Sequence, residues 1–358
     1  MFSYSFPAVK GIQAGKEYYI AMIPLSLLSK LFPDEDDVLP PEFRAQRRLN
    51  ETRIPEIEKY ILDNRKSYVF SALSASIDGH FSFESEKESP AGILKVDLSS
   101  RFMINDGQHR KAAITAALEE DPSLGDETIS IVFFKDEGLK RSQQMFTDLN
   151  KHAVKTSNSL STLYDSRDEI AMATKEVVNS VPVLKRFTDL ERDILGKNSR
   201  HFFTLNSLKK ANQKIIKTQF CSSEDMVFLV SYWSSVFENI GEWNDVVEKR
   251  MTKLEMRENY VLPWSVTINA FGKLGDFFYS NRDYSLDETL KGLSLIDWLR
   301  SATENWGDRI IRADGKIINT EAASTLACSK IKQHLGLPLS KEEKQKEQKL
   351  MDAREKRH

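Results

Sequence analysis

The chain has 358 residues, of which 40% are hydrophobic, and its 51 basic and 53 acidic side chains give a formal net charge of −2. This length and apolar content predict a globular protein with two domains, or one domain with a large extension. A membrane-spanning helix needs about 18 uninterrupted apolar residues. No stretch of the sequence approaches this length, so we do not expect a membrane-spanning protein. A total charge near zero neither indicates nor excludes nucleic acid, because only local clustering of charge does so.

The start of the chain and its cysteines bear on the cellular compartment. Met1 is not followed by a basic start and a long apolar run, so no signal peptide is expected. Cys221 and Cys328 are far apart and form no CxxC pair, which predicts reduced, buried thiols. We therefore expect a cytoplasmic protein without a membrane partner.

The first 140 residues alternate strand and helix patterns. Strands are expected at residues 18–23, 68–76, 93–98, 102–105 and 129–134, and helices at 27–32 and 43–63. Asp78-Gly79, followed by Phe81 and Phe83, predicts a hairpin. This order of elements predicts an α/β or α+β unit.

Four arginines lie close together near the predicted second helix. Arg44, Arg47 and Arg48 are spaced at i, i+3 and i+4, so they share one face if that part is helical, and Arg53 follows. Two interpretations stay open. These arginines either hold a phosphate backbone or pair with the glutamates that surround them in the sequence.

The strand–turn–helix stretch around Asp106 contains the most compact group of functional side chains. We expect Asp106 to cap the helix and to orient Arg110 or His109, while Gly107 permits a tight turn. The first helical turn then presents free N–H groups beside Gln108 and His109. Such a turn is typical of an anion site suited to phosphate.

From residue 141 to 338 the pattern is mainly helical, and its five tryptophans are expected to pack in a core rather than stack on bases. Within it, residues 185–217 contain nine basic and three acidic side chains, a local charge of +6, with His201, Phe202 and Phe203 interleaved. Such a segment attracts a polyanion, although an ordinary solvated helix surface is the alternative. Its basic side chains are Lys185, Arg186, Arg192, Lys197, Arg200, Lys209, Lys210, Lys214 and Lys217.

The remaining features indicate no further chemistry. Residues 339–358 form a charged tail, predicted to be an exposed helix. The chain has no GxxxxGK[ST], GxGxxG, HExxH or GxSxG motif. Its six histidines pair with no cysteine at zinc spacing, so no metal site is expected.

The stretch Asp106-Gly107-Gln108-His109-Arg110-Lys111-Ala112-Ala113 resembles the signature of DGQHR-domain proteins, the family that includes DndB of bacterial DNA phosphorothioate-modification (Dnd) systems. Residues 47–61 resemble its arginine-bearing N-terminal helix, and residues 146–150 and 159–168 resemble the segment after its core. More distantly, the element order resembles the ParB/sulfiredoxin-like fold, in which such a turn binds nucleotide phosphate. The chain lacks the sulfiredoxin cysteine and the paired arginines of ParB, which puts sulfinic-acid repair out of reach.

The resemblance implies an α+β fold, with a ParB/sulfiredoxin-like core at residues 1–140 and a mainly helical domain at 141–338. It also implies a DNA-binding repressor of the modification genes, which binds double-stranded promoter DNA in the bacterial nucleoid. The resemblance also suggests two further kinds of partner, namely other Dnd proteins and further copies of this chain. The expected DNA contacts are Arg44, Arg47, Arg48, Arg53, Lys185, Arg186, Lys197, Arg200, Lys209, Lys210 and Lys214.

The alternative is a ParB-like nucleotide-using enzyme, namely an ATPase, a CTPase or a nuclease. Gln108, His109 and Arg110 would then hold the phosphates of a nucleoside triphosphate with Mg²⁺. Asp106 or Asn150 would place the metal or a water molecule, and the catalytic candidates are Asp106, His109, Arg110 and Asn150. A third interpretation is an interaction subunit whose turn binds nothing.

Overall fold

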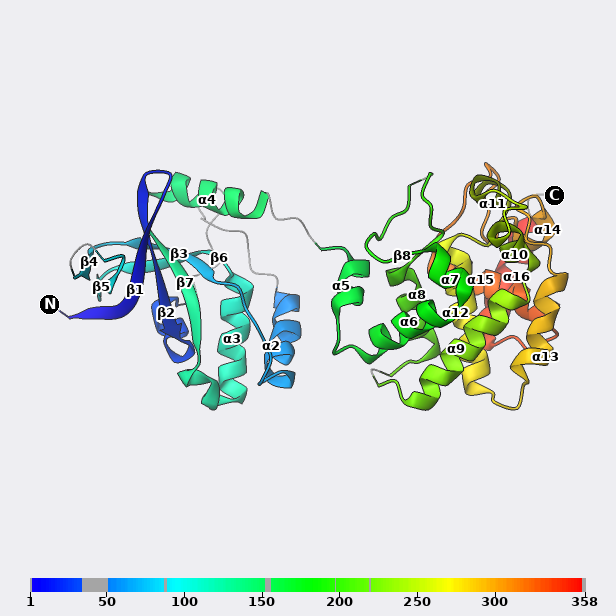
Figure 1. Ribbon diagram of the computed structural model, residues 1–358, viewed down its shortest axis with the longest axis horizontal. Coiled ribbons are helices and arrows are strands. Elements are labelled where there is room, and N and C mark those ends of the chain that lie inside the picture. Colours follow the sequence, from blue (N-terminus) through cyan, green and yellow to red (C-terminus); the bar gives the residue numbers. More distant parts are fainter. Residues whose placement is uncertain are drawn as a thin grey trace. The chain divides into compact units, whose positions relative to one another are not determined.

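The computed structural model describes residues 2–33, 51–86, 89–151, 156–196, 198–218 and 220–355. The chain divides into two compact units, Met1–Val154 (unit 1) and Lys155–His358 (unit 2). Unit 1 is built on a seven-stranded mixed sheet with helices, and unit 2 is largely helical (Figure 1). The predicted α+β class is therefore confirmed.

The sheet of unit 1 has the strand order β4-β5-β1-β2-β7-β3-β6. Only β3 and β7 pair in parallel, and the other neighbours are antiparallel. On β2 and β7 alternate residues are buried, as expected for strands with one face against the core. The strands are β1 (Ser3–Gln13), β2 (Lys16–Pro24), β3 (Leu73–Asp78), β4 (Phe81–Ser85), β5 (Ala91–Asp97), β6 (Arg101–Asp106) and β7 (Thr128–Lys135).

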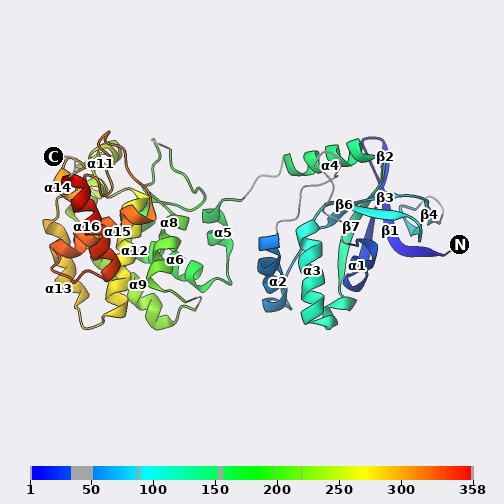
Figure 2. The same cartoon turned by 180° about the vertical axis from the view of Figure 1, so that it is seen from behind.

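Helices cover the buried face of this sheet. Ile61 of α2 and Ile114 of α3 join Ile131 and Phe133 of the central strand β7 in one apolar core. Both views show α2 beside α3, while α4 lies apart from them and packs against β6 (Figures 1 and 2). The elements are η1 (Leu25–Leu27), α1 (Leu28–Leu31), η3 (Glu51–Arg53), α2 (Ile54–Asp63), α3 (Gln108–Glu120), η4 (Pro122–Asp126) and α4 (Leu139–Lys151).

The hairpin predicted at Asp78-Gly79 is wrong. Strand β3 lies between β7 and β6 and bonds to both, so it offers no edge to β4. Gly79, at φ +136°, turns the chain away, and β4 pairs with β5 instead. The turn signal is local, whereas every residue of β3 from Leu73 to Ile77 is buried, and that burial fixes its partners.

Unit 2 is a helical array, and several of its helices begin at side-chain caps. Asp168 caps α6, and Thr204 and Ser222 form capping boxes at the starts of α8 and α9. A two-residue parallel pair joins β8 to β9. The elements are α5 (Asn158–Tyr164), α6 (Glu169–Ser180), α7 (Pro182–Phe187), β8 (Thr188–Asp189), β9 (Phe203–Thr204), α8 (Leu205–Ile215), α9 (Ser223–Glu238), α10 (Gly241–Val247), α11 (Lys253–Asn259), α12 (Ser265–Ser280), α13 (Leu286–Leu290), η5 (Lys291–Leu295), α14 (Thr303–Trp306), α15 (Glu321–His334) and α16 (Lys341–Glu355).

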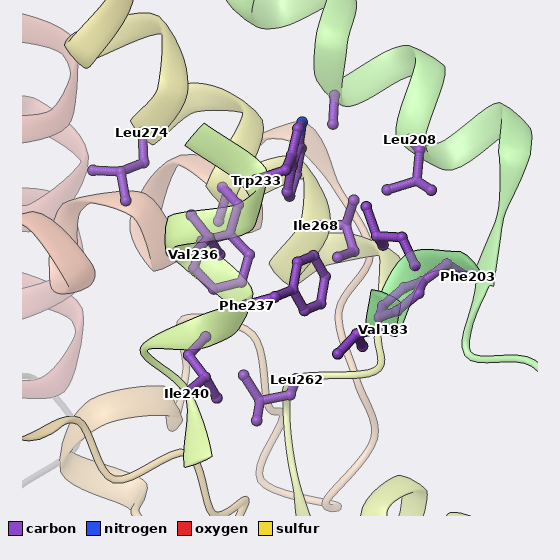
Figure 3. Packing of buried hydrophobic residues seen from close by; sticks show 14 of the residues in the cluster. Val183, Phe203, Leu208, Trp233, Val236, Phe237, Ile240, Leu262, Ile268 and Leu274 are labelled. Atoms are coloured by element: carbon purple, nitrogen blue, oxygen red, sulfur yellow. The ribbon is translucent and has the colours of Figure 1, made fainter. Parts of the chain in front are cut away.

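Tryptophans fill the core of unit 2, as predicted, together with phenylalanines. Four of the five tryptophans are at most 1% exposed, and Trp233 lies beside Phe237 in the packed interior of Figure 3. Gly272 of α12 brings two helices into close contact, because a Cβ there would lie 2.9 Å from the Cα of Ala211 in α8. Among the helices of the described ranges, none is long and apolar enough to cross a membrane.

The expectation of a fully exposed C-terminal helix is wrong for one face of α16. Glu343 and Glu347 are buried there against the rest of unit 2. Glu343 pairs with Lys332 of α15 at 2.9 Å, and Glu347 pairs with the buried Arg309 at 2.8 Å. Composition alone did not show this, because the apolar surface that α16 buries is small.

Candidate functional site

The turn between β6 and α3 requires glycine at position 107. Gly107 has φ +102°, in the left-handed region that residues with a side chain rarely adopt. A Cβ there would also lie 2.4 Å from Leu73 Cδ2 and 3.1 Å from Arg110 Nη2. Gly107 therefore allows the start of β3 and the arginine side chain to pack directly against the turn.

Asp106 orients Arg110 but does not cap α3. Helix α3 begins after Gly107 with no side-chain cap, so the expected capping role of Asp106 is wrong. Its Oδ2 instead accepts a hydrogen bond from Arg110 Nη2 at 2.7 Å. Asp106 is the last residue of β6 and Arg110 lies in the first turn of α3, so this ion pair joins the strand to the helix across Gly107.

The guanidinium of Arg110 is bound by protein acceptors. Its Nη1 donates to the carbonyl oxygens of Ser71 at 2.7 Å and Ala72 at 3.0 Å, and also to the Ser71 hydroxyl. The side chain is 18% exposed. Arg110 therefore ties the first turn of α3 to the chain entering β3, and its role in this fold is structural.

Further polar groups lie near this turn. Gln108 and His109 are half-buried in the first turn of α3. The Ser74 hydroxyl and the Asn105 carbonyl oxygen are buried and accept no hydrogen bond from the described residues. Ser74 lies opposite Asp106 in the β3–β6 ladder. The side chain of Asn150 lies outside the described part of the chain, so its expected role in placing a metal or a water molecule stays a prediction.

A hollow of about 760 Å³ in unit 1 is electrically balanced. Lys16, Lys135 and Arg141 line it together with Glu17, Glu137 and Asp148. Glu137 pairs with both Lys16 and Arg141. The neighbouring cations lower the pKa of Glu137, the hydrogen bond from Lys16 being the main cause. A hollow lined in this way offers no excess of positive charge to a phosphate.

Carboxylates from other elements bind three lysines of the basic segment 185–217. Lys209 pairs with Asp168 at 2.6 Å, and Lys214 pairs with Glu321 at 3.0 Å. Lys217 likewise binds a carboxylate, at 2.8 Å. These acidic partners come from the start of α6, from α12 and from α15, so the local excess of +6 in the sequence is partly neutralised in space.

The other cations of the expected DNA surface remain exposed. Among the described residues, Arg53 at the start of α2 has no ion-pair partner. The same is true of five exposed cations of segment 185–217, namely Lys185, Arg186, Arg192, Arg200 and Lys210. Arg44, Arg47, Arg48 and Lys197 lie outside the described residues.

Three cations of unit 2 gather around two buried phenylalanines. Arg186 of α7 and Lys253 of α11 lie over the Phe187 ring, at 5.5 and 5.6 Å from its centre. Arg257 of α11 lies 5.0 Å from the centre of the Phe202 ring. Among the described residues, neither Arg186 nor Lys253 has a carboxylate partner. Arg186 donates a hydrogen bond to the Val247 carbonyl oxygen. We call Arg186, Lys253 and Arg257 the basic cluster.

Sequence inspection found only one member of the basic cluster. Lys253 and Arg257 lie far from the segment 185–217 in the chain. Their i, i+4 spacing places both on one face of α11 and was the available signal. Phe202 and Phe203, interleaved with the basic segment, are 5% and 2% exposed and belong to the core. The rings of Phe187 and Phe202 therefore position cations and do not face bases.

Hydrogen bonds fix the chain beside the basic cluster. Arg257 donates to the carbonyl of His201, whose Nδ1 lies 3.3 Å from Asp189 Oδ2. Burial favours a higher pKa for Asp189, but the N–H groups of Arg192 and Glu191 and the His201 imidazole outweigh it, and the pKa lies below its usual value. Burial also lowers the pKa of Arg257. Asp189 is thus a charged anchor for this end of unit 2.

The fold and these sites define an α+β protein in which a glycine turn supports a sheet and a separate helical unit presents cations to solvent. The chain belongs to the DndB family: the model of that family, described as DNA-sulfur modification-associated, matches residues 6–338 and thus spans both units. No curated protein and no solved structure matches the chain. The resemblance carried by the DGQHR turn is confirmed at the level of the family.

Proposed function

We propose that the protein is a DNA-binding transcriptional repressor of a bacterial DNA phosphorothioate-modification gene cluster. Family membership provides the association with DNA sulfur modification. The basic cluster is the observation that supports DNA binding. Arg186 is exposed and Lys253 is half-buried, and neither has a carboxylate partner in the described part of the chain. Cations held in this way can exchange the counterions of a phosphate backbone.

The proposed partner is double-stranded promoter DNA in the bacterial nucleoid. The cluster would contact phosphates, and the exposed cations nearest to it in the chain, Lys185, Arg192 and Arg200, would extend the contact. Lys210, Arg53 and the arginines at 44, 47 and 48 remain candidate contacts, as does Lys197. Lys209 and Lys214 are weaker candidates because carboxylates already bind them. Self-association and binding to other Dnd proteins belong to the same proposal.

A mobility-shift titration over a salt series tests this function. The full chain is titrated against a promoter fragment from the modification cluster and against a shuffled duplex of equal length. If Arg186 and Lys253 each neutralise one phosphate, affinity falls by about 12-fold when monovalent salt rises fourfold. Affinity that does not change with salt contradicts phosphate contacts. Equal affinity for both duplexes contradicts a repressor.

A ParB-like nucleotide-using enzyme is the second candidate, supported by the uncapped start of α3. The N–H groups there, with the unbonded Ser74 hydroxyl and Asn105 carbonyl close in the fold, could receive a nucleoside triphosphate with Mg²⁺. This second candidate function includes the proposal that the sheet of unit 1 is related to the ParB/sulfiredoxin-like fold. Gln108, His109 and the Asp106–Arg110 pair would then flank the phosphates, with Asn150 as the further catalytic candidate. Absence of phosphate release from every nucleoside triphosphate, with and without DNA, eliminates it.

A further inference from the structure

The connection between β8 and β9, residues 190–202, follows the ring of Phe187, ends at the ring of Phe202 and exposes an isoleucine. Ile194 is 86% exposed, although isoleucine is among the residues most often buried. In Figures 1 and 2 this connection extends beyond the helices around it. We call residues 190–202 the β8–β9 loop. Lys197 within it lies outside the described residues.

Hydrogen bonds fix the segment that precedes Ile194. The carboxylate of Asp193 accepts hydrogen bonds from the backbone N–H groups of Asn158 and Ser159 at 2.8 Å, and from both of their side chains. The Ser159 hydroxyl also donates to the carbonyl of Arg192. Ile194 therefore follows a firmly held residue, and its exposure is not the result of an unattached chain.

The base of the loop is held as well. Phe202 N–H donates to the Phe187 carbonyl at 2.8 Å, and Asp189 accepts hydrogen bonds from the N–H groups of Glu191 and Arg192. Phe187 and Phe202 are the two rings that carry the basic cluster. The loop and the cluster therefore share one rigid base, and a polyanion bound by the cluster would lie close to the loop.

The charges of the loop favour a nucleic acid as the occupant. Arg192 and Arg200 are exposed, and neither has a carboxylate partner among the described residues. The carboxylates of Asp189 and Asp193 are engaged by internal hydrogen bonds, so of the acids in this region only Glu191 faces solvent freely. Along the chain, the apolar Ile194 is flanked by two exposed arginines. Proteins that enter the minor groove and separate stacked bases combine apolar and basic side chains in this way.

We propose that Ile194 inserts between base pairs of duplex DNA from the minor groove while Arg192 and Arg200 contact the adjacent phosphates. This inference rests on the proposed DNA-binding function and deepens it. Partial unstacking at one step kinks the duplex, and the cost depends on the step, so insertion favours sequences that deform easily. The loop would thus contribute specificity without hydrogen bonds to base edges.

The test compares Ile194→Ser, Ile194→Met and Leu295→Ser in the full chain. Leu295 is a matched control because it is 84% exposed and lies in η5 of the same unit. DNA bending is measured by energy transfer between dyes at the ends of the promoter fragment, and affinity by the salt-series titration. Sedimentation follows the oligomeric state of each variant.

We expect the wild type, Ile194→Met and Leu295→Ser to bend the fragment. Ile194→Ser should not bend the fragment, and its preference for promoter over shuffled DNA should fall about tenfold. The salt dependence of its affinity should stay unchanged. If Ile194→Ser bends the fragment as much as the wild type does, the proposal that Ile194 inserts between base pairs is wrong, while the DNA-binding function is unaffected. A change of oligomeric state in Ile194→Ser assigns the side chain to self-association and also overturns it. If the wild type binds no DNA, both proposals fail.

Discussion

The two arginine-bearing sites differ in what their guanidinium groups bind. In unit 1, Arg110 donates to Ser71, Ala72 and Asp106 and is thereby part of the fold. In unit 2, Arg186 and Lys253 lie over an aromatic ring, and no carboxylate in the described residues neutralises them. The distinctive DGQHR motif therefore stabilises the fold. The cations that are available to a partner belong to the basic cluster, which no sequence motif marks.

Among the substitutions, the largest expected effect comes from Arg110→Ala, which should lower the free energy of unfolding of unit 1 by about 2 to 3 kcal/mol through loss of charged hydrogen bonds. All five tryptophans lie between residues 233 and 306, so tryptophan fluorescence follows unit 2 alone, whereas far-UV circular dichroism follows both units. We expect an earlier dichroism transition and an unchanged fluorescence transition.

Lys59→Ala is the control for that experiment, since Lys59 is an exposed cation of α2 in the same unit. It should leave both transitions in place. A dichroism transition of Arg110→Ala identical to wild type would show that the arginine does not stabilise unit 1, and the contrast between the two sites would then disappear.

The next largest effect is expected from the double variant Arg186→Glu/Lys253→Glu. Affinity for promoter DNA should fall about 30-fold, equivalent to about 2 kcal/mol, with a shallower salt dependence and an unchanged melting temperature. The mobility-shift titration measures both quantities. Lys349→Glu on the exposed face of α16 is the control for charge reversal as such. Equal losses in both variants would mean that total charge, and not the basic cluster, controls binding.

Gly107→Ala should destabilise unit 1 by about 1.5 kcal/mol, because alanine is strained in the left-handed backbone and its Cβ meets Leu73. The dichroism transition measures this. Gly138→Ala separates the two causes, since Gly138 also has a positive φ but a Cβ there meets nothing within 4 Å. A larger loss at Gly107 than at Gly138 is the expected result. Equal losses would show that the close packing against the turn is unimportant.

The smallest effect concerns the β8–β9 loop in acid. Burial favours a higher pKa for Asp193, but the N–H groups of Asn158 and Ser159 outweigh it, so the native pKa is lowered. Its stabilisation is therefore complete above the unfolded-state pKa of about 4 and is lost as the pH falls through the lower native value. Asp193→Asn should melt earlier at neutral pH, by about 1 kcal/mol, and should match wild type near pH 2. A difference that persists in strong acid would exclude the carboxylate as its cause.

Local patterns predicted the elements that build the turn in unit 1. The apolar run before Asp106, the glycine and the helix spacing after it are all short-range signals, and the structure has β6, Gly107 and α3 in that order. Asp106 was expected to cap α3 and instead binds Arg110. Ser71 and Ala72, which also bind Arg110, lie almost 40 positions earlier, and no sequence pattern indicates such a contact.

Long-range pairing explains the other differences. Strand β1 was not predicted, because Pro7, Lys10 and Gly11 interrupt its apolar residues and only one face of it is buried. The basic cluster joins α7 to α11 through two rings that are themselves buried. The +6 segment was visible in the sequence, yet its neutralisation depends on carboxylates from three other elements. Sequence patterns located the charge and could not locate its partners.

Helix α16 has a practical consequence for anyone who trims this protein. The family match stops at residue 338, whereas α16 begins at Lys341. A fragment cut at that boundary would strip Glu343 and Glu347 from two cations that are 5% and 2% exposed, Lys332 and Arg309. Orphaned interior charges of this kind commonly cost about 3 to 5 kcal/mol. Such a fragment should express poorly or aggregate, and extension to Glu355 should rescue it.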